Sequence, residues 1–191
     1  MIGLKPSICV LLSLVAGGGC SVGPARVNAW VREQGGIDAE AARQARLERM
    51  LRVVSAGCEG RALRASVLAT DRPSAFSWRS GQVFVTRGLI DLLDDEELAA
   101  ALDHELGHLL SDGHVRPVAG LKGCEEQKCF DAESRADETG VRLLESQGIA
   151  PGAMARMLIK VKAAAGGPAP CQAALEHRIE LLESRTAAAT R

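Results

Sequence analysis

The sequence predicts a mostly helical α+β domain with one small β-sheet. Apolar residues recur at helical spacing in five segments, and only two short runs resemble strands. With 191 residues, the chain suits one domain and can bury a core without covalent staples. Its 23 Lys and Arg nearly balance its 24 Asp and Glu. No basic block stands out, which argues against nucleic acid as a partner.

Residues 1–20 have the three-part pattern of an export signal. Lys5 gives a short positive region, Ile8 to Ala16 is an apolar run too short to span a bilayer, and small residues precede Cys20. This ending resembles a lipobox, so we expect Cys20 to carry a lipid that anchors the exported chain to a membrane of the cell envelope or periplasm. Gly17 replaces the usual aliphatic residue, so simple signal-peptide cleavage is one alternative, and a buried N-terminal helix is another.

Export would place the remaining cysteines in an oxidising compartment. Of six cysteines, Cys9 and Cys20 belong to the signal, and four others remain: Cys58, Cys124, Cys129 and Cys171. An even number favours disulfides. Cys124 and Cys129 are close enough in sequence to close a small loop, which leaves Cys58 for Cys171. The alternatives are a bond from Cys171 to one of that first pair, or a second metal site.

The N-terminal half is expected to contain the sheet. Residues 21–37 are expected to be a linker, and a domain over 38–191 follows it. A helix is expected over 38–56, with Asp38 as its N-cap. Strands are expected at Ala65 to Thr70 and, after a turn at Gly81, at Gln82 to Thr86.

The C-terminal half is expected to be helical. Helices are expected over four segments: 95–111, 130–147, 151–165 and 172–186. Gly148 suits the end of one helix and Pro151 suits the first turn of the next. No internal repeat is visible, so the helices belong to the same domain as the sheet.

The helix over 95–111 carries the motif that points to chemistry, His104-Glu105-Leu106-Gly107-His108. Residues four apart lie on one helical face, so both imidazoles can bind a single ion. Glu105 is turned by about 100° from His104, beside the ion, where it can act as a general base. Two incidental core histidines would be expected on the leucine face of this helix, and these histidines lie off that face.

A catalytic zinc ion needs a third protein ligand. No third histidine follows at the spacing that would continue the motif, but Glu133 on the helix over 130–147 can supply it. Ala136 and Gly140 share its face and are small, so this helix can pack closely on the first. Asp137, one turn after Glu133, can hold a ligand histidine by its second ring nitrogen. We therefore expect one zinc ion per chain.

His-Glu-Leu-Gly-His followed by Glu-x-x-Ala-Asp resembles the M48 family of zinc metallopeptidases, the gluzincins related to HtpX, Ste24 and Oma1. The resemblance implies a zincin-like fold, an active-site helix, endopeptidase activity on protein or peptide substrates, and one zinc ion. Unlike the membrane members, the sequence shows no transmembrane helix after its signal, so it resembles a soluble or lipoprotein branch.

The resemblance also marks residues outside the metal motif. The segment Ser74-Ala75-Phe76 and the strand residues Val83-Phe84-Val85 match a family stretch that implies substrate binding. Zincins bind extended substrates along an edge strand, so we expect the strand over 82–86 to be that edge. Arg178 matches a family position as well. Because the chain has no Tyr, we expect Arg178 to stabilise the oxyanion, with His114, His177 and the backbone as alternatives. A surface salt bridge on an amphipathic helix is the other role open to Arg178.

The sequence thus predicts a zinc-dependent endopeptidase with Glu105 as its general base. Two other functions remain open. One is a zinc-bearing scaffold or chaperone without peptidase activity, and the other is a lipoprotein assembly factor that docks partners in the envelope. The intact Glu105 argues against the first, since metal binding alone does not need a general base.

Overall fold

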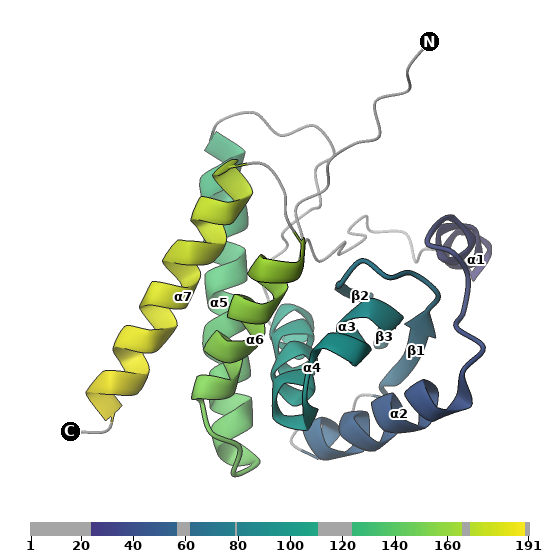
Figure 1. Cartoon of the computed structure of the whole chain (residues 1–191), viewed down its shortest axis with the longest axis horizontal. Coiled ribbons are helices and arrows are strands. Elements are labelled where there is room, and N and C mark those ends of the chain that lie inside the picture. Colours follow the sequence, from purple (N-terminus) through teal and green to yellow (C-terminus); the bar gives the residue numbers. More distant parts are fainter. Residues whose placement is uncertain (1–23, 57–61, 79, 111–123, 166–168, 190–191) are drawn as a thin grey trace.

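The computed structural model describes residues 24–56, 62–78, 80–110, 124–165 and 169–189. Helix α4 (Asp95–Leu110) lies in the middle of the fold (Figure 1). On one side of it pack α5 (Cys124–Ser146), α6 (Gly152–Ala165) and α7 (Ala169–Ala189). On the other side lie α2 (Ala41–Ser55), α3 (Arg87–Leu92) and a small sheet. The prediction of a mostly helical fold with a small sheet is confirmed.

The sheet consists of β1 (Arg64–Leu68), β2 (Ala75–Trp78) and β3 (Gln82–Thr86), in the order β1-β3-β2. Strand β3 pairs in parallel with β1 and antiparallel with β2. The prediction that β3 is an edge strand is therefore wrong. Its three central residues are buried on both faces of the sheet, which favours a central position.

Burial also overturns the assignment of Val83, Phe84 and Val85 to substrate binding. Val83 and Val85 are 0% exposed and face the core beneath the sheet, while Phe84 is 2% exposed and faces the opposite side. None of them has surface left for a peptide. The residues that match the family stretch here fill the core.

Strand β2 and helix α3 were not expected from the sequence. All four residues of β2 are buried, so the strand has no alternation between exposed and buried residues. A tight turn with Gly81 at φ +82° joins β2 to β3. Thr86 ends β3 and caps α3, because its hydroxyl oxygen accepts a hydrogen bond from the Leu89 N–H at 3.2 Å.

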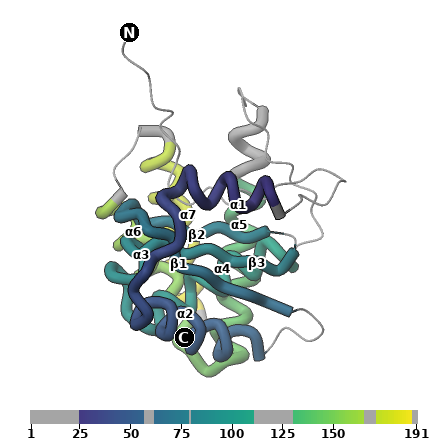
Figure 2. The backbone as a smooth tube through the Cα atoms, turned by 90° about the vertical axis from the view of Figure 1, so that its right-hand side faces the viewer, coloured from purple at the N-terminus to yellow at the C-terminus, as the bar shows by residue number. Residues whose placement is uncertain are grey.

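Residues 24–38 belong to the folded domain and are not simply a linker. Helix α1 (Pro24–Glu33) lies across the sheet on the face opposite α4 (Figure 2). After this helix, Ile37 forms an antiparallel bridge with Leu68 of β1. The Asp38 N–H donates to the Val67 carbonyl at 2.9 Å. This segment covers the free edge of β1, because its backbone groups pair with those of that strand.

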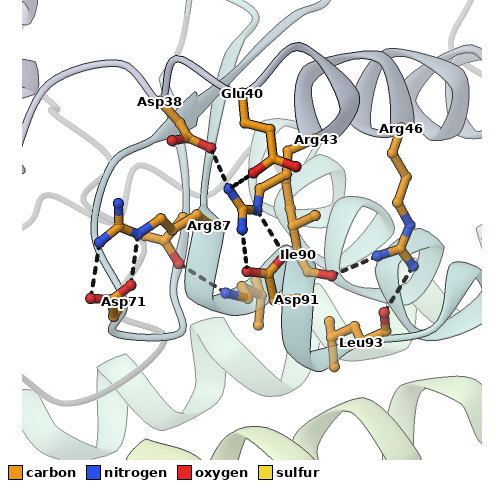
Figure 3. A network of polar contacts seen from close by, with 11 residues as sticks. Asp38, Glu40, Arg43, Arg46, Asp71, Arg87, Ile90, Asp91 and Leu93 are labelled. Atoms are coloured by element: carbon orange, nitrogen blue, oxygen red, sulfur yellow. Dashed lines mark hydrogen bonds and ion pairs between the residues drawn. The ribbon is translucent and has the colours of Figure 1, made fainter.

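Arginines of α2 connect this helix to α3 (Figure 3). Arg43 makes a two-point ion pair with Asp91, both contacts at 2.8 Å, and also pairs with Asp38 and Glu40. Arg46 donates to backbone carbonyls at the end of α3, which would otherwise lack partners. Asp38 is therefore an ion-pair partner of Arg43. The expectation that it is the N-cap of α2 is wrong, since Glu40 holds that position without a side-chain cap.

Cys124 and Cys129 both lie in α5, but their side chains are outside the description, so the disulfide between them stays a prediction. Cys171, near the start of α7, forms a disulfide bond, and the partner cysteine lies outside the described side chains. Cys20 and Cys58 lie outside the described residues, so the remaining pairings stay predictions.

The signal segment over 1–20 also lies outside the described residues. Within the part of the chain that is described, no helix combines the length and apolarity needed to cross a bilayer.

Candidate metal centre

Helix α4 holds the motif residues at the centre of the domain. It begins with a reciprocal cap, in which the Glu97 N–H donates to Asp94 Oδ1 and the Asp94 N–H donates to Glu97 Oε2, both at 2.9 Å. From Glu97 to Gly107 every residue of the helix is buried, including His104 and Glu105 at 0% exposure. Packing on all sides fixes the direction in which the motif side chains point.

Three side chains from two helices converge on one point. His104 Nε2 lies 3.1 Å from His108 Nε2. One oxygen of Glu133, on α5, lies 3.3 Å from His104 Nε2, and the other lies 3.4 Å from His108 Nε2. Among the described residues these three side chains form the group that can hold a metal ion.

These separations fit a zinc ion. Ligand atoms about 2.0–2.1 Å from a tetrahedral zinc lie about 3.3 Å from one another. The observed spacings of 3.1, 3.3 and 3.4 Å are close to that value, the last two being to different oxygens of Glu133. Two imidazoles and one carboxylate also form a typical donor set of a catalytic zinc site, which keeps one position open for water.

Small residues allow α5 to approach α4 closely enough for Glu133 to reach the histidines. A Cβ atom on Gly107 would lie 2.5 Å from the Ala136 carbonyl oxygen. A Cβ atom on Gly140 would lie 3.1 Å from the backbone nitrogen of His104. The close packing expected from Ala136 and Gly140 is therefore observed, and Gly107 of the motif takes part in it.

Behind the metal ligands lies Asp137. Its Oδ1 lies 2.8 Å from His104 Nδ1, the contact expected from the one-turn spacing of Glu133 and Asp137. If Nδ1 carries the proton and donates it to Asp137, the Nε2 lone pair is free to bind a metal. Asp137 is 3% exposed and contacts the site through the His104 ring.

Comparison with known proteins points the same way. The sequence model of the family described as Peptidase family M48 matches residues 39–130. A segment of 41 residues is 49% identical to a protein named Protease HtpX homolog from Methanothermobacter thermautotrophicus. That match covers 19% of this chain and 16% of the relative, so the chain matches only a small part of the relative's length.

The resemblance to peptidase family M48 is confirmed. Both histidines of the motif and Glu105 lie inside the matched residues. Glu133, Asp137 and Arg178 lie beyond residue 130, so their part in the site depends on the fold.

Arg178 of α7 lies against the two acids of α5. Its Nε and Nη2 donate to the two oxygens of Asp137, both at 2.7 Å, and its Nη1 donates to Glu133 Oε2 at 3.0 Å. The side chain is 4% exposed. We expected Arg178 to stabilise an oxyanion, but every nitrogen of its guanidinium group has a carboxylate partner. The structure therefore favours a role in holding these carboxylates.

The charges of this cluster shift its pKa values. Burial opposes ionisation of Glu133, but the nearby charges of His108 and Arg178 outweigh it and hold its pKa well below the usual value. Burial likewise opposes ionisation of Asp137, and Arg178 and His104 lower its pKa. Both carboxylates are thus ionised at neutral pH, as a metal ligand and its support must be.

Burial of His104 disfavours its protonated form, but hydrogen bonds to Asp137 and Glu133 outweigh burial and raise its pKa to about 10. Without a metal, the His104 ring is therefore protonated on both nitrogens, and the proton on Nε2 faces Glu133. Metal binding must displace this proton. The electrostatics of the site thus favour a cation at this point.

The other expected site residues that the structure describes are not part of the metal-binding group. Ser74 precedes β2, and Ala75 and Phe76 begin it. His177 is exposed and stacks on Phe130, with ring centroids 5.2 Å apart. His114 lies outside the described residues.

Proposed function

We propose that this chain is a zinc-dependent endopeptidase of zincin-like fold. The convergence of His104, His108 and Glu133 at tetrahedral separations carries this proposal. Family membership supports peptidase activity, and the buried Glu105 beside the ligands supplies the group that hydrolysis needs. The alternative of a metal-bearing scaffold explains the ligands but not the retained acid.

Held by His104, His108 and Glu133, a zinc ion would supply an activated water and a Lewis acid for the substrate carbonyl. Glu105 would take a proton from that water and pass it to the leaving amine. Asp137 fixes the orientation of the His104 ring. Arg178 keeps Asp137 and Glu133 ionised and in place.

The signal-like segment over 1–20 supports a further proposal, that the mature protein is exported to the cell envelope or periplasm and held at a membrane by lipid on Cys20. Metabolic labelling with a radioactive fatty acid tests it. Label should enter the wild-type chain and not the Cys20→Ala chain.

The function is tested by measuring zinc content and casein cleavage together. Wild-type protein should contain one zinc ion per chain and cleave casein. Glu105→Gln should keep its zinc and lose activity by about a hundredfold or more, the scale of general acid–base catalysis. Glu145→Gln, at an exposed position on α5, is the matched control and should be fully active. Zinc-loaded wild-type protein that cleaves nothing, or a fully active Glu105→Gln variant, would refute the proposal.

A further inference from the structure

One aromatic residue of the chain lies apart from the others. The sequence contains three Phe and two Trp residues, and all of them except Phe130 form the cluster between the sheet and α1. Phe130, on α5, is half-buried and belongs to neither of the two apolar clusters of the described core. Packing of that core therefore does not account for this ring.

Phe130 stacks on His177 of α7. The ring centroids lie 5.2 Å apart and the ring planes are inclined by 25°, so the rings lie nearly face to face. The His177 side chain is 58% exposed, and its Nδ1 lies 3.7 Å from Glu180 Oε2 on the same helix. The two rings thus form a flat wall, in which one ring is half-buried and the other is open to solvent.

This wall stands beside the third metal ligand. Phe130 precedes Glu133 by three residues, so their Cβ atoms lie about 5–6 Å apart along one side of α5. His177 precedes Arg178, whose Nη1 donates to Glu133 Oε2 at 3.0 Å. Helices α5 and α7 run side by side (Figure 1), and each brings one ring next to Glu133.

Glu133 also marks the side from which a substrate can approach the metal ligands. His104 and Glu105 are 0% exposed, whereas the side chain of His108 is 8% exposed and that of Glu133 is 16% exposed. Within the described parts of the chain, the ligand set is therefore most open at Glu133. A peptide whose carbonyl reaches this centre passes the Glu133 side, where the side chain next to that carbonyl meets the wall.

We propose that Phe130 and His177 determine specificity, as the wall of a subsite that takes an aromatic or large apolar side chain next to the scissile bond. A flat ring or a branched apolar side chain gains contact energy on such a wall, whereas a methyl group gains little. This inference rests on the proposed function, because it concerns the substrate of the same metal centre.

Two zinc-binding probes that differ in one side chain test the subsite. N-acetyl-phenylalanine hydroxamate and N-acetyl-alanine hydroxamate bind zinc through the same group, and titration calorimetry gives their Kd values for zinc-loaded protein. Wild type should bind the phenylalanine probe about tenfold more tightly than the alanine probe. Phe130→Ala should reduce this preference to about twofold or less, while Phe130→Leu and His177→Ala, which each keep part of the wall, should retain about threefold.

Ile159→Ala is the matched control. Ile159 is an apolar residue of α6 that is 45% exposed. The next residue, Lys160, pairs with Glu97 in the first turn of α4, two turns before His104. Ile159→Ala should therefore keep the wild-type preference. Zinc content is measured for every variant, because a role confined to holding α5 and α7 together would change zinc content and the affinity for both probes alike.

A Phe130→Ala protein that keeps the wild-type preference would overturn the proposal. So would equal losses of affinity for both probes, since these would show a purely structural role. Peptides released from casein give a second readout. Wild type should cut beside aromatic or large apolar residues, and Phe130→Ala should lose this pattern; an unchanged pattern would count against the subsite.

Failure of the proposed function gives a different result. If zinc-loaded wild type cleaves no casein but prefers the phenylalanine probe, the proposed function fails and the subsite stands. If it cleaves casein and binds both probes equally, the subsite fails alone. A protein that holds no zinc would bind neither probe, and that outcome would refute both proposals.

Discussion

Replacement of Arg178 by methionine tests how the buried charges are balanced. The wild-type guanidinium makes three contacts of 2.7–3.0 Å with Asp137 and Glu133, and it is 4% exposed. Arg178→Met keeps most of the apolar stem but leaves two buried carboxylates without their cation. Breaking a buried ion pair in this way costs about 3–5 kcal/mol. We expect a loss of that size in the free energy of unfolding of metal-free protein at pH 7.

Arg185 provides a matched control on the same two helices. It pairs with Glu138 of α5 at 3.2 Å, but both side chains are about half exposed. Water screens such a pair, so Arg185→Met should cost about 0–1 kcal/mol. Urea unfolding in the presence of a chelator measures both variants. Equal losses for Arg178→Met and Arg185→Met would refute the charge-balance argument.

The loss at Arg178 should depend on pH and on zinc. In wild type the pKa values of Glu133 and Asp137 lie below their ordinary values. Their contribution to stability is therefore present above unfolded-state pKa values of about 4 and is lost as pH falls through the lowered values. The difference between wild type and Arg178→Met should be largest near pH 7 and should shrink below about pH 4. Saturating zinc should reduce it at pH 7, because a dication replaces the missing charge.

Two further predictions concern the helix α4 itself. Gly107→Ala should destabilise the protein by about 1–3 kcal/mol and weaken zinc binding, because its Cβ would lie 2.5 Å from the Ala136 carbonyl oxygen. Gly152→Ala is the control, because its Cβ would have no neighbour nearer than 3.7 Å. Urea unfolding and zinc titration measure both variants. Equal effects of the two substitutions would contradict the expectation. Burial raises the pKa of Asp103 to about 8, so its ionisation costs stability increasingly from about pH 4 upward. Asp103→Asn should therefore raise the urea midpoint at pH 8 and change it little at pH 4, and equal shifts at both would show that ionisation is not the cause.

The candidate metal ligands could be predicted from the sequence because helical periodicity is a local property. His104 and His108 are one turn apart, as are Glu133 and Asp137, so each pair shares a face whatever the rest of the chain does. Ala136 and Gly140 showed which face of α5 could come close to another helix. The sequence therefore determined both halves of the site, although not the partners that each half would meet.

Strand neighbours were not determined in this way. The residues of β3 have the apolar pattern of a strand, but the pattern does not state how many neighbours the strand has. Its central position depends on β1, which is more than a dozen residues away, and on β2, which has no alternation of its own. The same limitation applies to α1, because its apolar face packs on Phe76 and Trp78, which are distant in the sequence.

Arg178 shows most clearly what each level decides. The sequence by itself identified the candidate metal site of this chain, because a pair of histidines, an adjacent acid and a distant acid require only helical spacing to be recognised. Only the tertiary structure decided what Arg178 does, since α7 must first lie beside α5 before the guanidinium can meet Asp137 and Glu133. In a buried site the identity of the partner fixes the role of a charge, because an ion without a counter-charge is costly there. Partners far apart in sequence are brought together by packing alone.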